Sequence, residues 1–371
     1  MLNQILKLNT KMFDPKVEQV YIRQGFGEGL LQAGENDKNV VALCADLTDS
    51  TKMNLFKERF PERFIEMGVA EQNLVTVASG MAAMGKIPFV SSYAMFSPGR
   101  NWEQIRTTIA YNDRKVIIAG SHAGISVGPD GGTHQAIEDL AIMRVMPNMT
   151  VISPCDAIEA KKATLALAKI KGPSYIRLAR EKTPLMTTSD TPFEIGKAQI
   201  FFTPEVGLAQ VGIIATGVLL HKALKVAKEL EGEGIKVKVM NLATIKPLDS
   251  QAIIALARET KKIVTVEEHQ IAGGMGSAVA ECLAENFPVP MRFIGVHDKF
   301  GQSGTPEELI EHYEMGEKDI KKAVIELRDN PKKREEMGKM GENFIDENYR
   351  WPVWIPKWRE FFREALKNAQ M

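Results

Sequence analysis

Cysteine is scarce in this sequence: there are three in 371 residues, at positions 44, 155 and 282. They lie far apart and form no Cys-x-x-Cys pair, which argues against a disulfide framework and against a zinc ribbon. Few and scattered cysteines are typical of proteins from a reducing compartment. We therefore expect a cytoplasmic protein.

An excess of charge of either sign is also missing, since 47 Lys and Arg residues balance 47 Asp and Glu residues. Without a basic excess, a nucleic-acid partner is not expected. No apolar run reaches the roughly 18 residues of a membrane span, and the first residues, MLNQILK, lack the apolar stretch of a signal peptide. With 25% charged and 44% hydrophobic residues, the composition indicates a globular protein and excludes a disordered chain.

What the sequence does contain is a repeated alternation of short apolar runs with longer amphipathic stretches. The apolar runs predict strands at 39–43, 87–91, 115–119, 150–153, 174–178, 211–215, 236–240, 262–266 and 291–295. The amphipathic stretches predict helices at 71–84, 135–143, 157–169, 219–231, 249–259 and 276–285. Several strands are nearly all apolar, as strands buried on both faces of a parallel sheet are. The alternation predicts an α/β fold with doubly wound, mainly parallel sheets.

The length favours two domains, at roughly 100–200 residues each. The segment EKTPLMTTSDTPF at 181–193 is rich in Thr, Ser and Pro and has no helical or strand period, so we interpret it as a linker. We expect a first α/β domain at 15–185, a second at 193–328 and a short helical extension at 329–371. The extension is either a pair of docked helices or a frayed tail, and its sequence indicates no role.

The densest polar cluster is the segment HAGISVGPDGGTHQ at 122–135. It follows an expected strand and precedes an expected helix, and ligands of open α/β sheets bind just beyond the carboxyl ends of strands. Its glycines let a small ligand approach His122, Asp130 and His134 closely. The alternative is a glycine-rich turn with a histidine that caps the helix.

Three further clusters carry charge at predicted strand or helix ends. Glu71 begins a helix of small apolar residues, where it is either a capping residue or a catalytic acid. Asp46 begins the turn DLTDS after the strand at 39–43, which is either part of a site or an ordinary capped turn. Arg177 and Arg180 end the strand at 174–178 and either hold an anion or form surface salt bridges.

Two glycine-rich segments are weaker signals. GFGEG at 25–29 follows no expected strand and lacks the context of a dinucleotide-binding loop. GGMG at 273–276 follows a strand and opens a helix, but its spacing indicates only a tight turn. The sequence contains no HExxH, P-loop, GxSxG or EF-hand motif.

In this order the polar motifs resemble those of the C-terminal half of transketolases, over roughly residues 15–325. The segment DGGTHQ at 130–135 is similar to the DG-x-THQ signature of transketolases and deoxyxylulose-phosphate synthases. GVAEQ at 68–72 resembles their acidic motif at the cofactor pyrimidine, and ADLTDS at 45–50 resembles the transketolase stretch A-D-L-T-x-S. The resemblance implies a pyrimidine-binding domain, a C-terminal domain and the cofactor thiamine diphosphate.

The resemblance also implies which residues bind the cofactor. Glu71 would hydrogen bond to the pyrimidine ring and take part in its proton transfer, for which a buried carboxyl group is suited. Tyr93 and Phe96 would stack on the pyrimidine. Asp46 would lie near the thiazolium ring at a subunit interface, and Arg100 would line the same pocket.

For the substrate, the resemblance implies a ketose phosphate whose phosphate is held by charge-assisted hydrogen bonds. The matching donors come from four separate segments: Arg23, Ser50, His122 and Arg180. Asp130 would bind the hydroxyl beside the ketose carbonyl. His134 would be catalytic near the reacting carbons, and Arg177 has no counterpart and is taken as structural.

One family motif is missing, the GDG…N sequence that binds the diphosphate and a divalent metal. The chain is therefore expected to be one subunit of a split transketolase that is active only with an N-terminal, diphosphate-binding partner. Mg²⁺ or Ca²⁺ would be bound through that partner and not through this chain. An α2β2 heterotetramer in which this chain self-associates, and a place in the pentose phosphate pathway, follow from the same resemblance.

Other interpretations keep the fold but change the function. A 2-oxoacid dehydrogenase E1 β subunit has the same two domains but lacks DG-x-THQ. A deoxyxylulose-phosphate synthase shares that signature, but A-D-L-T-x-S favours transketolase. A specialised transketolase for an unusual phosphorylated or sulfonated sugar, and a non-enzymatic partner-binding protein, stay open. The last is disfavoured because the whole set of candidate residues is present: Glu71, His122, Asp130, His134 and Arg180.

Overall fold

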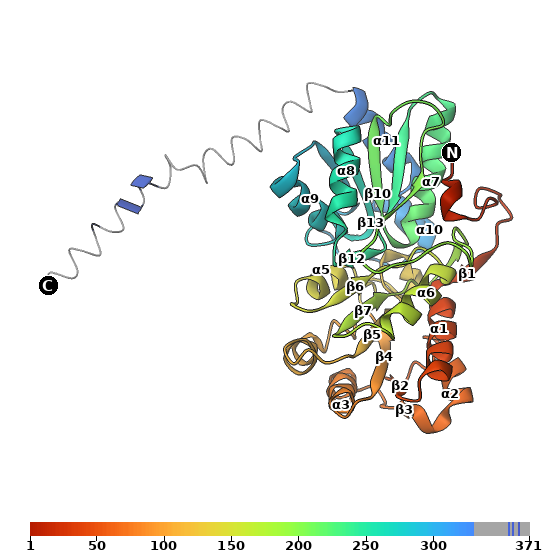
Figure 1. Cartoon of the computed structure of the whole chain (residues 1–371), viewed down its shortest axis with the longest axis vertical. Helices are drawn as coiled ribbons and strands as arrows, with labels where there is room; N and C mark the ends of the chain where they lie inside the picture. The colour runs from red at the N-terminus through yellow and green to blue at the C-terminus, as the bar shows by residue number, and fades with distance from the viewer. Residues whose placement is uncertain (330–354, 357, 360–362, 364–371) are drawn as a thin grey trace.

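The computed structural model describes residues 1–329, 355–356, 358–359 and 363. The chain folds into two α/β domains that lie one above the other along the long axis of the molecule (Figure 1). The helical extension expected at 329–371 therefore lies almost wholly outside the described residues. None of the helices in the described part of the chain is both long enough and apolar enough to cross a membrane.

The first sheet has seven strands, in the order β12-β6-β7-β5-β4-β2-β3. Their bounds are β2 (Val40–Cys44), β3 (Phe64–Glu66), β4 (Ile87–Tyr93), β5 (Ile117–Ser121), β6 (Thr150–Ile152), β7 (Ser174–Arg177) and β12 (Thr244–Lys246). All neighbours are parallel except β12, which pairs antiparallel with β6. Because β12 comes from the second half of the chain, the second domain supplies an edge strand that the sequence did not predict.

Helices cover both faces of this sheet, because every side chain of β2 is buried and successive side chains point to opposite faces. Val40, Ala42 and Cys44 face one core, and Val41 and Leu43 face the other. The first core is closed by α1 (Ile22–Asn36), α2 (Asn54–Arg59) and α6 (Ala157–Leu167). The second is closed by α3 (Glu71–Ala83), α4 (Trp102–Gln104), the π-helix η3 (Ile105–Ala110) and α5 (Asp139–Arg144). The domain is thus doubly wound.

The expectation that no strand precedes the GFGEG segment is wrong. The short strand β1 (Gln19–Tyr21) precedes it and pairs antiparallel with β8 (Lys182–Pro184), which lies inside the segment interpreted as a linker without strands. The glycines lie in α1, where a Cβ at Gly25 would collide with the backbone of Ala157 in α6. Gly29 also packs against α6, and Gly27 packs against Lys52 and Leu55 at α2. The glycines therefore serve close packing of α1, and a dinucleotide-binding loop is not present here.

The second sheet has five strands, in the order β14-β13-β10-β11-β9, and only β9 is antiparallel. Its strands are β9 (Gln199–Phe202), β10 (Val211–Ala215), β11 (Val237–Asn241), β13 (Ile263–Gln270) and β14 (Met291–Val296). The helices are α7 (Leu220–Gly232), α10 (Pro306–His312) and α11 (Glu317–Asp329) on one face, and α8 (Ser250–Thr260) and α9 (Met275–Asn286) on the other. The N-terminal segment packs here, since Leu8 and Met12 belong to this core.

Candidate functional site

The candidate residues gather where the central strands of the first sheet end. β2, β4, β5 and β7 are adjacent and parallel, so their carboxyl ends meet at one edge of the sheet. Asp46 follows β2, Tyr93 ends β4, His122 follows β5 and Arg180 follows β7. The fold therefore brings segments that are far apart in the sequence to one place.

Glu71 is the first residue of α3, and its side chain is buried, with 2% of its surface exposed. Its Oε1 accepts a hydrogen bond from Ser92 Oγ at 3.1 Å, and its Oε2 accepts one from Arg100 Nη1 at 2.7 Å. Asn101 Nδ2 holds its backbone carbonyl at 2.8 Å. Since the N-cap position is occupied by Ala70, Glu71 is a buried carboxyl group held by side chains and not a capping residue.

Four rings lie next to one another, and Arg100 links them to this carboxyl group. Tyr93 and Phe96 are nearly parallel, with centroids 6.5 Å apart and an interplanar angle of 22°. His122 lies 4.0 Å from Tyr93, and His134 stands edge-on to Phe96 at 5.4 Å. The residues implied for pyrimidine stacking and the two candidate histidines thus form one cluster, which Arg100 joins with its guanidinium 4.9 Å above Phe96.

Two arginines, Arg23 and Arg180, lie next to the rings, and we call them the cationic group. Arg23 Nη1 donates to the backbone carbonyl of Arg180, and Arg180 Nη1 donates to that of Val127. Arg180 also lies 3.5 Å from the Asp130 carboxylate. Burial lowers the pKa of His122 to about 3, and the positive charges of Arg23 and Arg180 add to this shift. His122 is therefore neutral near pH 7 and can donate one hydrogen bond to an anion from a ring nitrogen.

Arg23 carries an unused donor at this place. Its Nε is buried, and among the described residues no group accepts a hydrogen bond from it. A buried polar atom without a partner is costly unless a ligand or water completes it. The cationic group is thus chemically suited to an anionic ligand.

Asp46 and Ser50 lie on the turn after β2. In the described part of the chain, no hydrogen bond or ion pair joins their side chains to the rings or to the arginines. Asp46 has a positive φ of 58°, and its backbone amide donates to Glu66 Oε1 at 2.7 Å. Glu66 also accepts from Thr48 Oγ1 at 2.9 Å and from Gly68 N at 3.1 Å.

Glu66 is a residue that sequence analysis missed. It ends β3, a three-residue strand without a clear pattern, and it ties the Asp46 turn to the turn that leads into Glu71. A single acidic residue in an unpredicted strand gives no signal of its own. Ser92, which bonds to Glu71, was missed for the same reason, because it is a small residue inside a buried strand.

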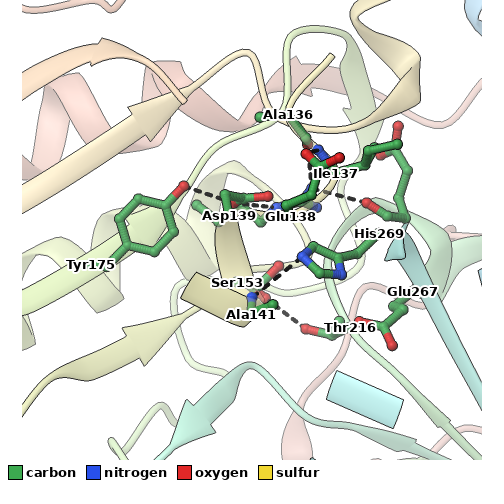
Figure 2. Close-up of polar contacts among 12 residues, drawn as sticks. Ala136, Ile137, Glu138, Asp139, Ala141, Ser153, Tyr175, Thr216, Glu267 and His269 are labelled. Atoms are coloured by element: carbon green, nitrogen blue, oxygen red, sulfur yellow. Dashed lines mark hydrogen bonds and ion pairs between the residues drawn. The ribbon is translucent and has the colours of Figure 1, made fainter. Parts of the chain in front are cut away.

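Arg177 does not form the surface salt bridge that sequence analysis considered. It is buried with Asp139, and its Nε lies 2.8 Å from Asp139 Oδ2, which also accepts from the Tyr175 hydroxyl at 2.7 Å. Figure 2 shows Tyr175 pointing toward Asp139 at the start of α5. Burial alone would lower the pKa of Arg177, but the attraction of Asp139 outweighs it and raises the pKa. Arg177 is thus part of a buried ion pair between β7 and α5.

The GGMG segment is a tight turn, as predicted. Glu267 in β13 accepts hydrogen bonds from the backbone amides of Met275 at 2.6 Å and Gly276 at 2.8 Å. A Cβ at Gly274 would collide with this carboxylate. Within the described residues, no group of three or more His, Cys, Asp or Glu side chains is arranged to hold a metal ion.

Two family models match the chain. The transketolase pyrimidine binding domain matches residues 18–186, and the transketolase C-terminal domain matches residues 206–320. All candidate residues, from Arg23 to Arg180, lie in the first matched range. The second matched range contains β10, β11, β13 and β14 of the second sheet.

Individual relatives match over nearly their whole length. The chain is 40% identical over 315 residues to the 6-deoxy-6-sulfo-D-fructose transketolase subunit SqwH of Clostridium sp. (strain MSTE9). This match covers 85% of this chain and 97% of the relative. It is 35% identical over 306 residues to one of the subunits of the apulose-4-phosphate transketolase of Phocaeicola vulgatus, covering 82% and 96%. Among solved structures it is similar to a split gene transketolase described as an inactive β4 tetramer, with a TM-score of 0.77, 44% identity and coverage of 83% and 98%.

Proposed function

The chain belongs to the transketolase family, as the C-terminal subunit of a split enzyme, and from this premise we propose how its residues serve the reaction. The reaction is the transfer of a two-carbon ketol unit between sugar phosphates. Thiamine diphosphate, when bound, supplies the carbon nucleophile that carries the unit. The residues of this chain hold the pyrimidine end of the cofactor and the substrate.

The observation that carries this assignment is the buried carboxyl group of Glu71, which Arg100 links to the aromatic pair of Tyr93 and Phe96. A carboxyl group fixed in a buried place can bind a ring nitrogen and hold or share a proton there. Near-parallel aromatic rings suit the flat face of a pyrimidine. His134, edge-on to Phe96, is the proposed acid–base group at the substrate.

We assign the anionic end of the substrate to the cationic group. Arg23, Ser50, His122 and Arg180 are the proposed donors, and Asp130 is the proposed acceptor for the hydroxyl beside the carbonyl. The buried Nε of Arg23 without an acceptor supports this assignment. One relative is named for a sulfonated sugar and the other for a phosphorylated sugar. A terminal phosphate is the primary assignment, and a sulfonate has the same donor requirements.

The diphosphate end of the cofactor requires a second chain. We propose that an N-terminal transketolase subunit supplies the diphosphate site and holds Mg²⁺ or Ca²⁺. Asp46 and Glu71 would then lie near the contact with that subunit. Val69, which precedes Glu71 closely and is 72% exposed, supplies apolar surface for such a contact. The assembly is proposed to be an α2β2 heterotetramer that acts in the cytoplasm.

The decisive experiment is reconstitution. The chain is purified from its own cells with the proteins that accompany it, and ketol transfer from xylulose 5-phosphate to an aldose phosphate is measured. The complex should be active with thiamine diphosphate and a divalent metal, whereas the chain alone should be inactive. Turnover by the purified chain alone would contradict the split-subunit proposal.

A further inference from the structure

The second domain contributes none of the proposed cofactor or substrate residues. It nevertheless forms hydrogen bonds and close contacts with the loop that carries three of them. We call residues 122–135 the substrate loop, since it bears His122, Asp130 and His134. We propose that Gln135 and Glu268 are positioning residues through which the C-terminal domain sets the geometry of the substrate loop. The proposal rests on the function proposed above for that loop, and it assigns a catalytic purpose to the C-terminal domain.

Gln135 joins three separate pieces of backbone. Its side chain is 2% exposed, and its Nε2 donates to the carbonyls of Ile125 at 3.1 Å, Gly128 at 3.3 Å and Gln302 at 2.9 Å. The first two carbonyls lie in the substrate loop, and the third lies in the second domain, just before α10. One amide group therefore holds the middle of the loop to its own end and to the other domain.

Glu268 holds the loop at a second point. It lies in β13, is 3% exposed, and accepts a hydrogen bond from the backbone amide of Ser126. Burial raises the pKa of Glu268, and this rise is opposed by the positive charge of Arg177 and by the hydrogen bond from the Ser126 backbone amide. Arg177 also donates to the Glu268 carbonyl at 2.9 Å and to the carbonyl of Ala136, just after the loop, at 3.2 Å.

The glycines of the loop are explained by these contacts. At Gly124, whose φ is +94°, a Cβ would lie against the Glu268 carboxylate. At Gly131 it would lie 2.6 Å from Ser303 Oγ, and at Gly132 it would lie 2.6 Å from the Gly301 carbonyl. Only residues without a side chain allow the two domains to approach this closely.

The contacts between the two domains continue into the start of α5, as Figure 2 shows. The backbone amide of Gln270 donates to the Ile137 carbonyl at 2.8 Å, and His269 Nε2 accepts from Ala141 N at 3.4 Å. These two contacts hold the segment that follows the loop, where it runs into α5. An active-site group that is misplaced by about 1 Å can lose about 10²-fold in rate, so contacts of this kind have a direct kinetic consequence.

The first test measures hydrogen exchange in the full chain and needs no substrate. Gln135→Met removes the two N–H donors that serve its three carbonyl acceptors, at nearly constant shape, and Glu268→Leu removes the acceptor for Ser126. Both variants should speed exchange of the amides at 123–135 by about tenfold, with no change in β2 or β4. Glu268→Gln keeps an oxygen for Ser126 and should restore slow exchange.

Glu267 provides the matched control. It neighbours Glu268 in the same strand and is equally buried, but it binds the start of α9 and not the loop. Glu267→Leu, the counterpart of Glu268→Leu, should affect the start of α9 but leave exchange at 123–135 unchanged. If Gln135→Met and Glu268→Leu also leave it unchanged, the second domain does not hold the loop and the proposal is wrong.

The second test uses the reconstituted complex. Gln135→Met and Glu268→Leu should raise KM for the ketose phosphate and lower kcat, so that kcat/KM falls about 10²-fold. Affinity for thiamine diphosphate should not change, because the proposed cofactor residues are not on the loop. Glu268→Gln should recover most of the loss. A simple loss of folded protein would lower kcat at constant KM, and that result would overturn a positioning role.

The two proposals fail in different ways. A wild-type complex that transfers no ketol unit contradicts the proposed function, while the exchange test still decides whether the second domain holds the loop. A wild-type complex that is active, with faster loop exchange but unchanged KM in both variants, contradicts only the positioning role.

Discussion

Arg100 and Glu71 form an ion pair across the boundary between solvent and core, with Nη1 2.7 Å from Oε2. The side chain of Arg100 is 48% exposed, whereas that of Glu71 is 2% exposed. Arg100 therefore meets the carboxyl group from its accessible side and leaves the other oxygen to Ser92. The same guanidinium lies over Phe96, so one side chain links the carboxyl group to the aromatic pair.

Glu71→Gln should reduce turnover of the reconstituted complex by about 10²–10⁴-fold, which is the usual cost of losing a positioned acid–base group. The amide keeps the size and the contacts with Ser92 and Arg100, but it cannot hold or release a proton. Initial rates and thermal unfolding are measured together, and the melting temperature should stay close to that of the wild type. Glu159→Gln, which changes another buried glutamate in the first domain, should keep normal turnover. Near-normal turnover of Glu71→Gln would reject the assigned role.

The isolated chain should bind thiamine and thiamine diphosphate with similar, weak affinity. Diphosphate affinity needs donors and a cation, and no metal-binding cluster occurs among the described residues. The reconstituted complex with Mg²⁺ should prefer thiamine diphosphate strongly. Isothermal titration with both ligands measures this preference. A strong preference of the chain alone for the diphosphate would mean that it carries a diphosphate site.

The elements that the sequence predicted are those with long, clear patterns. The strand predicted at 211–215 is β10, and the helix predicted at 71–84 is α3 to within one residue. The missed strands β1, β3, β8 and β12 are three residues long, and they and the four-residue β9 lie at sheet edges or outside the main sheets. The helices α1, α2, α10 and α11 were also missed, and α1 carries four glycines, which weaken its helical pattern. α5 begins at Asp139 rather than at 135, because Gln135 and Ala136 are bonded to the second domain and to Arg177.

The site shows the same division between local pattern and tertiary contact. Glu71, His122 and His134 could be singled out because they stand in motifs beside strands or helices. Glu268 and Gln135 could not be given a role, since their partners are backbone groups up to 167 positions away in the chain. Such contacts depend on how the two domains pack together, which the spacing of nearby residues in the sequence does not predict.

Glu159 should make stability depend on pH. It is buried at the start of α6, and burial, aided by the negative charge of Asp156, raises its pKa to about 7 from the ordinary value of 4.5. The folded state then holds the proton more tightly than the unfolded state. The resulting stabilisation is complete below about pH 4.5 and is lost as the pH rises through about 7.

Urea unfolding of the wild type and of Glu159→Gln between pH 5 and 8 tests this. The free energy of unfolding of the wild type, relative to the variant, should fall with rising pH by at most about 3 kcal/mol. Glu62→Gln, at a side chain that is 70% exposed, should give a curve parallel to the wild type. Parallel curves for Glu159→Gln would show that Glu159 does not titrate in this range.

Arg180→Ala should separate phosphorylated from unphosphorylated substrates. If Arg180 binds the phosphate, its loss removes a charge-assisted hydrogen bond worth about 1.5–3 kcal/mol, which corresponds to about a 10- to 100-fold rise in KM for ketose phosphates. This binding is present in both the ground state and the transition state, so kcat should change much less. Erythrulose and hydroxypyruvate have no phosphate to lose and should respond weakly.

The structure adds one correction to that expectation for Arg180→Ala. Arg180 also holds the Val127 carbonyl of the substrate loop, so a small loss common to all substrates should accompany the specific one. The diagnostic quantity is therefore the ratio of the KM changes for phosphorylated and unphosphorylated donors. Lys225→Ala, which breaks an exposed pair with Glu317 between α7 and α11, should leave both KM values unchanged. Equal changes for both donor classes in Arg180→Ala would place the phosphate elsewhere and leave Arg180 with only its role in the loop.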